Sequence, residues 1–229
     1  MSKSLIIKEL RETWWLGLIA ALLLGLYLFV QMGYQPDVFS LSFRRLENYQ
    51  GRLVIPQPFL VAGFREAVLW IAAGLGLIVG FWQTVSESVQ GTWLFLLHRP
   101  LSRQSVILSK LVSGLMVTAV AIAVPLLMYL MWAMTPGTHA NPFELWMTTE
   151  SIVAWLVGLT TYLAAFLCGM RGARWYASRL VPLVPVLFFG LMIFGGVPGL
   201  ITPLGFATLP VDVILIAVIL FTARHRDYA

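Results

Sequence analysis

The sequence has few charged residues and almost no cysteine. Charged residues make up 11% of the 229 positions and hydrophobic residues 59%, whereas soluble domains carry about 25% charged residues. Lipid offers the backbone no hydrogen-bond partner, so a chain this apolar is predicted to cross the bilayer as helices. The single cysteine, Cys168, excludes an internal disulfide and a thiolate metal cluster. We therefore expect an all-α, multi-pass membrane protein.

Familiar catalytic patterns are also absent. No Gly-Lys dipeptide occurs, which excludes the GxxxxGK[ST] loop that cradles nucleotide phosphates. His98, His139 and His225 are far apart and fall in predicted loops or tails, so they form neither a zinc-binding pair nor an intramembrane base. We predict no catalytic residue, no metal site and no enzymatic activity in this chain.

Six apolar segments are predicted to cross the membrane. A helical span needs about 20 apolar residues, because the hydrocarbon core is about 30 Å thick. The predicted spans are 14–33, 67–85, 111–134, 151–170, 179–194 and a weaker one that ends near Thr222. Together they are expected to form a single transmembrane domain over residues 1–229.

The basic residues favour one orientation. With both termini in the cytoplasm, eleven of the fifteen Lys and Arg residues lie on the cytoplasmic side, as the positive-inside rule requires. The other four lie in an external loop at 34–66, which is a candidate contact for an accessory protein. The same rule explains the net charge of +5 without a nucleic-acid partner.

Residues 1–13 are predicted to form an amphipathic helix in the cytoplasmic interface. Its residues divide into an apolar and a charged face: Ile6, Ile7, Leu10 and Trp14 against Lys8, Arg11 and Glu12. The alternative is a frayed cytosolic tail.

The last forty residues contain an apolar segment that is broken by glycine and proline. A final helix starting at Pro210 would rise only about 18 Å by Thr222, so we expect the preceding segment to re-enter the bilayer from outside. Asp212 would then lie in a first helical turn near the outer surface, and no charge is predicted at mid-membrane depth. The alternative is a sixth helix that begins near Pro203.

Between the second and third spans, residues 86–101 predict a short cytoplasmic helix. Ser86 would cap it and Pro100 would end it. The next helix would follow an N-cap at Ser102, with Arg103 and Lys110 at headgroup level and the lysine snorkelling outward. An interfacial helix that only places Trp93 among headgroups is the alternative.

This stretch carries a run of residues in a recognisable order: Glu87, Gly91-Thr92, Leu96-Leu97, Pro100, Ser102-Arg103, Leu108 and Lys110-Leu111. The run resembles the loop between the second and third spans in the membrane subunits of type-2 ABC exporters, although His98-Arg99 departs from the usual small or varied residues. The resemblance implies that 87–100 is a coupling helix seated on a separate ATPase. Glu87 and Arg99 would make charged contacts there, and Trp93 and Leu97 would pack at its edge.

The resemblance also implies a function. The chain would be a permease subunit in the plasma membrane, paired with a second copy or a homologue, and ATP and Mg would bind only to the partner ATPase. The substrate is not predicted, although an uncharged passage favours an amphipathic or lipid-like molecule. The alternatives are an ion-coupled secondary carrier or channel, and a membrane scaffold or sensor subunit that transports nothing.

Overall fold

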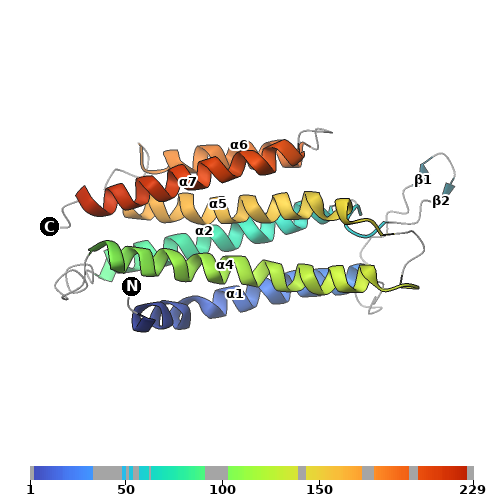
Figure 1. Ribbon diagram of the computed structural model, residues 1–229, viewed down its shortest axis with the longest axis horizontal. Coiled ribbons are helices and arrows are strands. Elements are labelled where there is room, and N and C mark those ends of the chain that lie inside the picture. The colour runs from blue at the N-terminus through green and yellow to red at the C-terminus, as the bar shows by residue number, and fades with distance from the viewer. Residues whose placement is uncertain are drawn as a thin grey trace.

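The computed structural model is a bundle of long helices that lie side by side (Figure 1). The structure describes residues 3–32, 48–49, 52–53, 57–61, 63–90, 103–138, 143–171, 178–195 and 201–225. The helices are α1 (Lys3–Gln31), α2 (Phe64–Gln90), α4 (Arg103–Met134), α5 (Thr149–Met170), α6 (Val184–Phe194) and α7 (Ile201–His225). Short 3-10 segments, η2 (Leu145–Thr148) and η4 (Val181–Leu183), precede α5 and α6, and a hairpin pairs β1 (Asn48–Tyr49) with β2 (Arg52–Leu53).

The bundle has two distinct ends. Helix α1 begins and α7 ends at one of them, and the β1–β2 hairpin lies beyond the other (Figure 1). We call these the terminus end and the hairpin end. Helices α1 and α4 run away from the terminus end, and α2, α5 and α7 run toward it. The charge distribution predicts that the terminus end is cytoplasmic.

Within the described residues, five helices are long and apolar enough to cross a membrane: α1, α2, α4, the α5 region and α7. This confirms the prediction of several membrane-spanning helices. The fifth predicted span is shorter than expected, because α6 has 11 residues and rises only about 16 Å. Pro182 lies in η4 and Pro185 in the first turn of α6, and neither has a backbone N–H to extend the helix backward.

Helix α5 is central and packs most closely against α2. A Cβ on Gly76 would lie 2.5 Å from the Gly158 carbonyl oxygen, and one on Gly158 would lie 2.5 Å from the Ala72 Cβ. The two backbones therefore touch. In lipid, where burial of apolar surface drives association only weakly, such close approach adds the dispersion energy that holds helices together.

Helix α7 corrects the prediction for the last forty residues. It is helical from Ile201 to His225, so residues 201–210 are not re-entrant and the alternative start near Pro203 is confirmed. Pro203 lies in the first turn, where no N–H is needed, and Pro210 lies inside the helix rather than at its start. Asp212 is consequently in the middle of α7 and not in a first turn near the outer surface.

Aromatic rings fill the core at the hairpin end. Phe59 and Phe64 are both buried, and their ring centroids lie 4.8 Å and 5.3 Å from that of Tyr129. Tyr27 and Phe143 complete this aromatic cluster at 6.0 Å from Phe64 and Phe59, respectively. Phe59 has a φ of 66°, a left-handed conformation that costs an L-residue about 1–2 kcal/mol. Burial of its ring against the rings of Phe64, Tyr129 and Phe143 offsets that cost.

Candidate functional site: a polar core at the terminus end

The predicted coupling region lies largely outside the described residues. Helix α2 ends at Gln90 and α4 begins at Arg103, in agreement with the predicted N-cap at position 102. The residues between these helices are not described, and neither are the side chains of Glu87 and Arg103. The undescribed predicted site residues are Gly91, Thr92, Trp93, Leu96, Leu97, Arg99, Pro100 and Ser102.

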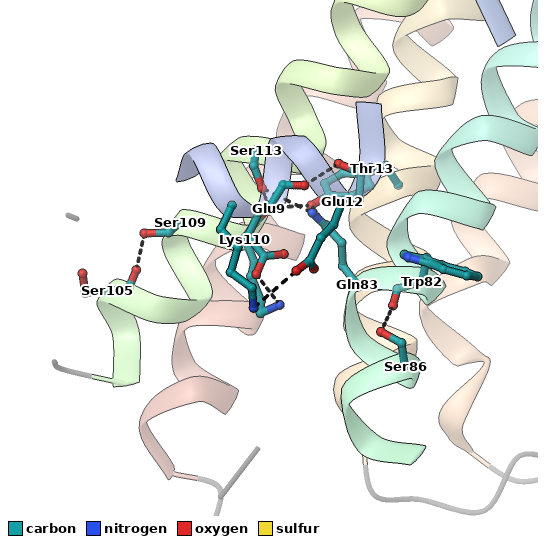
Figure 2. Close-up of polar contacts among 12 residues, drawn as sticks. Glu9, Glu12, Thr13, Trp82, Gln83, Ser86, Ser105, Ser109, Lys110 and Ser113 are labelled. Carbon is teal, nitrogen blue, oxygen red and sulfur yellow. Dashed lines mark hydrogen bonds and ion pairs between the residues drawn. The ribbon is translucent and has the colours of Figure 1, made fainter. Parts of the chain in front are cut away.

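One detail of that prediction is wrong. Ser86 does not cap a new helix, because α2 continues through it to Gln90. Its hydroxyl donates a hydrogen bond to the Trp82 carbonyl, one turn earlier in the same helix (Figure 2). A coupling helix, as the resemblance implies it, would therefore begin after residue 90.

An ion pair lies inside the bundle at this end. Lys110 Nζ on α4 is 2.8 Å from Glu9 Oε1 on α1 (Figure 2). The two side chains are only 3% and 4% exposed. Burying an unpaired charge costs several kcal/mol, so each of these groups requires the other. The pair therefore fixes the start of α1 to the base of α4.

This pair is not predicted by the sequence pattern, in which residues 1–13 form a separate interfacial helix. Helix α1 is in fact uninterrupted from Lys3 to Gln31. Ile7 and Trp14, which were assigned to the apolar face, are exposed. The buried residues form one stripe at helical spacing that continues into the membrane-crossing part: Leu5, Glu9, Thr13, Leu16, Ala20, Leu24 and Leu28.

Lys110 likewise differs from its prediction. Its side chain does not snorkel outward but is buried beside Glu9. The signal that could have found the pair is the position of Glu9 in the apolar stripe, because an acidic residue there needs a basic partner within the bundle. Lys110 is the basic residue nearest to the predicted third span.

A hydrogen-bond network extends the ion pair to α2 and α5. The Tyr162 hydroxyl on α5 donates to Gln83 Oε1 on α2 at 2.9 Å, and Gln83 Nε2 donates to Ser113 Oγ on α4 at 3.3 Å. Ser113 in turn donates to the Lys110 carbonyl at 2.8 Å. All of these side chains are buried. We call Glu9, Gln83, Lys110, Ser113 and Tyr162 the polar core.

Gly114 provides the space for this network. A Cβ at that position would lie 2.2 Å from the Tyr162 hydroxyl oxygen and 2.5 Å from Gln83 Oε1. Any larger residue at position 114 would push α4 away from α5 at this level. A contact below about 3 Å is a steric clash, and the Tyr162 ring, which is packed on both sides, cannot move away to relieve it.

An arginine closes the helix end that lies next to the polar core. Arg179 Nε and Nη2 donate to the Cys168 and Gly169 carbonyls at 3.0 Å and 3.1 Å, at the C-terminus of α5. Both carbonyls lie in the last turn of α5, beyond the reach of the regular i+4 bonds of the helix, and among the described backbone contacts the Cys168 carbonyl otherwise accepts only a 3.3 Å bond from the Arg171 N–H. A cation at a helix C-terminus is stabilising. The arginine thus ties the start of the α6 region to α5.

The polar core joins four helices through directional contacts. Glu9 belongs to α1, Gln83 to α2, Lys110 and Ser113 to α4, and Tyr162 to α5. None of these helices can slide past its neighbour without exchanging or breaking such a contact. Among the described residues, no group of three His, Cys, Asp or Glu side chains is placed to hold a metal ion. The arrangement suits the transmission of movement between helices.

The fold and the polar core are those of a multi-pass helical membrane protein. The chain belongs to a family described as "Protein of unknown function (DUF2705)", whose model matches residues 17–170, more than half of the sequence. The match runs from within α1 to the end of α5, so it includes every member of the polar core except Glu9. No curated protein and no solved structure matches the chain.

Proposed function

We propose that this chain is the permease subunit of an ATP-driven ABC transporter. It exports a substrate by alternating access in the plasma membrane, or in the inner membrane of a Gram-negative cell. Two copies, or one copy and a homologue, form the passage. Separate ATPase subunits bind ATP and Mg and supply the energy.

The run of residues at 87–111 that resembles the exporter loop is the observation that carries this proposal. The helices on either side of it support the proposal mechanically. Gln83 lies seven residues before the end of α2, and Lys110 lies seven residues after the start of α4. Both are therefore about 10 Å along their helices from the segment between them. A force on that segment reaches the polar core within two helical turns on either side.

Co-purification tests the proposal. An affinity-tagged chain, expressed together with candidate ABC ATPase subunits from the same organism, should recover one of them and stimulate its ATP hydrolysis. Glu87→Ala and Trp93→Ala should each lower the recovered ATPase several-fold, because the first removes a charged contact in the last turn of α2 and the second removes an aromatic anchor from the segment that follows it. Membrane insertion should be unchanged in both variants.

Two matched substitutions control for the loss of a carboxylate and for the loss of an aromatic ring as such. Glu12→Ala removes a half-exposed carboxylate at the same end of the bundle, and Trp70→Ala removes an exposed ring near the hairpin end. Both should recover as much ATPase as the wild type. Undiminished recovery and stimulation in Glu87→Ala and Trp93→Ala would contradict the coupling assignment.

An ion-coupled secondary carrier is the second candidate. The position of Asp212 in the middle of α7 favours it, because carboxylates at mid-membrane depth commonly mark ion-coupling sites. Proteoliposomes that contain only this chain distinguish the two functions. Uphill transport driven by a proton or sodium gradient, without any ATPase, would establish the carrier and refute the ABC permease.

A further inference from the structure

Asp212 lies at mid-depth in the bundle, on the face of α7 that packs against α5. Two contacts indicate the register of these parallel helices: a Cβ on Gly205 would lie 2.5 Å from Val153 Cγ2, and the Thr160 side chain lies beside the Asp212 carboxylate. Both pairs differ by 52 in sequence number (205 − 153 and 212 − 160). Asp212 is the twelfth residue of α7, and Thr160 is the twelfth of α5.

The carboxylate interrupts an otherwise closed interface. The buried residues of α7 recur every three or four positions: Ile201, Gly205, Thr208, Leu215, Ile219 and Ala223. Asp212 occupies the same stripe but is only partly buried. Part of Asp212 is therefore exposed at the surface of the bundle at this level of α7.

The charge of Asp212 is not matched within the described part of the chain. Its Oδ1 atom is buried and has no hydrogen-bond partner, and no described Lys, Arg or His forms an ion pair with it. The side chains one turn away on α7 are Thr208, Leu209, Leu215 and Ile216. The Thr208 hydroxyl donates to the Gly205 carbonyl, and the other three side chains are apolar. An unpaired carboxylate at this depth is energetically costly, so the site is stable when a cation or a proton neutralises it.

The surroundings restrict which cation can bind. Mg²⁺ and Ca²⁺ require about six to eight oxygen ligands, whereas the described side chains at this site offer one carboxylate and the hydroxyls of Thr160 and Thr208. A monovalent organic cation needs only one counter-charge, and its apolar groups can contact Leu209 and Ile216. We propose that Asp212 binds the positive charge of an amphipathic cation that reaches the α5–α7 seam at mid-depth. The inference rests on the proposed transport function, for which it names a class of substrate.

Direct binding tests the inference without any ATPase. The full chain in zwitterionic nanodiscs should bind radiolabelled tetraphenylphosphonium saturably, and tetraphenylborate, an anion of the same shape, should not compete. Asp212→Asn should weaken phosphonium binding at least tenfold, whereas Asp212→Glu should stay within a few-fold of the wild type. Asparagine keeps the size and shape of the side chain and removes only its charge, so if Asp212 were purely structural this variant would leave binding unchanged.

A second measurement on the wild type protects the test against misfolding of the variants. Dicyclohexylcarbodiimide modifies carboxyl groups in apolar sites, and saturating phosphonium should slow its reaction with Asp212 several-fold. Equal binding by the wild type and Asp212→Asn, no saturable binding by the wild type, or labelling that phosphonium does not slow would each overturn the inference. None of these results depends on ATPase recovery, so failure here is distinguishable from failure of the proposed ABC function.

Discussion

The two ends of the bundle are held together by different kinds of contact. At the terminus end, the polar core joins four helices through one ion pair and a chain of hydrogen bonds. At the hairpin end, the aromatic cluster joins α1, α2 and α4 through ring contacts of 4.8–6.0 Å. Both sets are buried, but only the first depends on partners of defined chemistry and direction.

This difference has a mechanical consequence. Ring contacts are weakly directional and tolerate small shifts, whereas an ion pair or hydrogen bond weakens steeply once its atoms separate or misalign. A displacement of α4 relative to α1 therefore changes the energy of the terminus end more sharply than that of the hairpin end. The segment that resembles a coupling loop is at the terminus end. This is therefore the end whose packing energy changes more sharply when the helices move.

The largest effect is expected when one partner of the ion pair is removed. Lys110→Met leaves Glu9 buried without a counter-charge and should lower the free energy of unfolding by about 3–5 kcal/mol. Titration with sodium dodecyl sulfate in mixed micelles, followed by tryptophan fluorescence, measures this change. The double variant Glu9→Gln/Lys110→Met should recover most of the loss, because no uncompensated charge then remains. A loss below about 1 kcal/mol in Lys110→Met would show that the charges are not paired in the protein.

A somewhat smaller effect is expected at the hairpin end. Phe64→Ala opens a cavity beside Tyr129 and should cost about 3 kcal/mol in the same titration. Phe64→Leu should cost less than about 1.5 kcal/mol, because another apolar side chain of similar volume can repack. At the ion pair, by contrast, even an isosteric replacement of one partner is costly. This is the sharpest difference between the two ends. Equal losses of stability for Phe64→Ala and Phe64→Leu would contradict it.

The smallest effect is expected within the hydrogen-bond network. Tyr162→Phe removes the donor to Gln83 Oε1 and should cost about 0.6–1.7 kcal/mol, the range of hydrogen bonds between membrane helices. A double-mutant cycle with Ser113→Ala should be non-additive, because both hydroxyls contact the same Gln83 amide. Strict additivity would mean that the two hydroxyls act independently.

The local sequence pattern was sufficient to predict the helices, but it did not predict which side chains of different helices contact one another. The apolar runs predicted membrane-spanning helices near their observed positions, and the predicted cap at Ser102 agrees with the start of α4 at Arg103. The glycine and proline residues around 195–210 led to a wrong prediction of where the last helix begins. Proline in a first turn and glycine against a neighbouring helix are compatible with a continuous α7, and only the contact between Gly205 and Val153 explains the glycine.

The sequence by itself determined that this chain lies in a membrane as helices, because a backbone surrounded by lipid must satisfy its own hydrogen bonds and the length of each apolar run is local information. Tertiary structure alone decided that Glu9 meets Lys110, that Tyr162 reaches Gln83, and that Asp212 lies level with Thr160. These pairs are separated by 52 to 101 residues. Their contacts depend on the rotation and register of whole helices against one another, which no local pattern specifies.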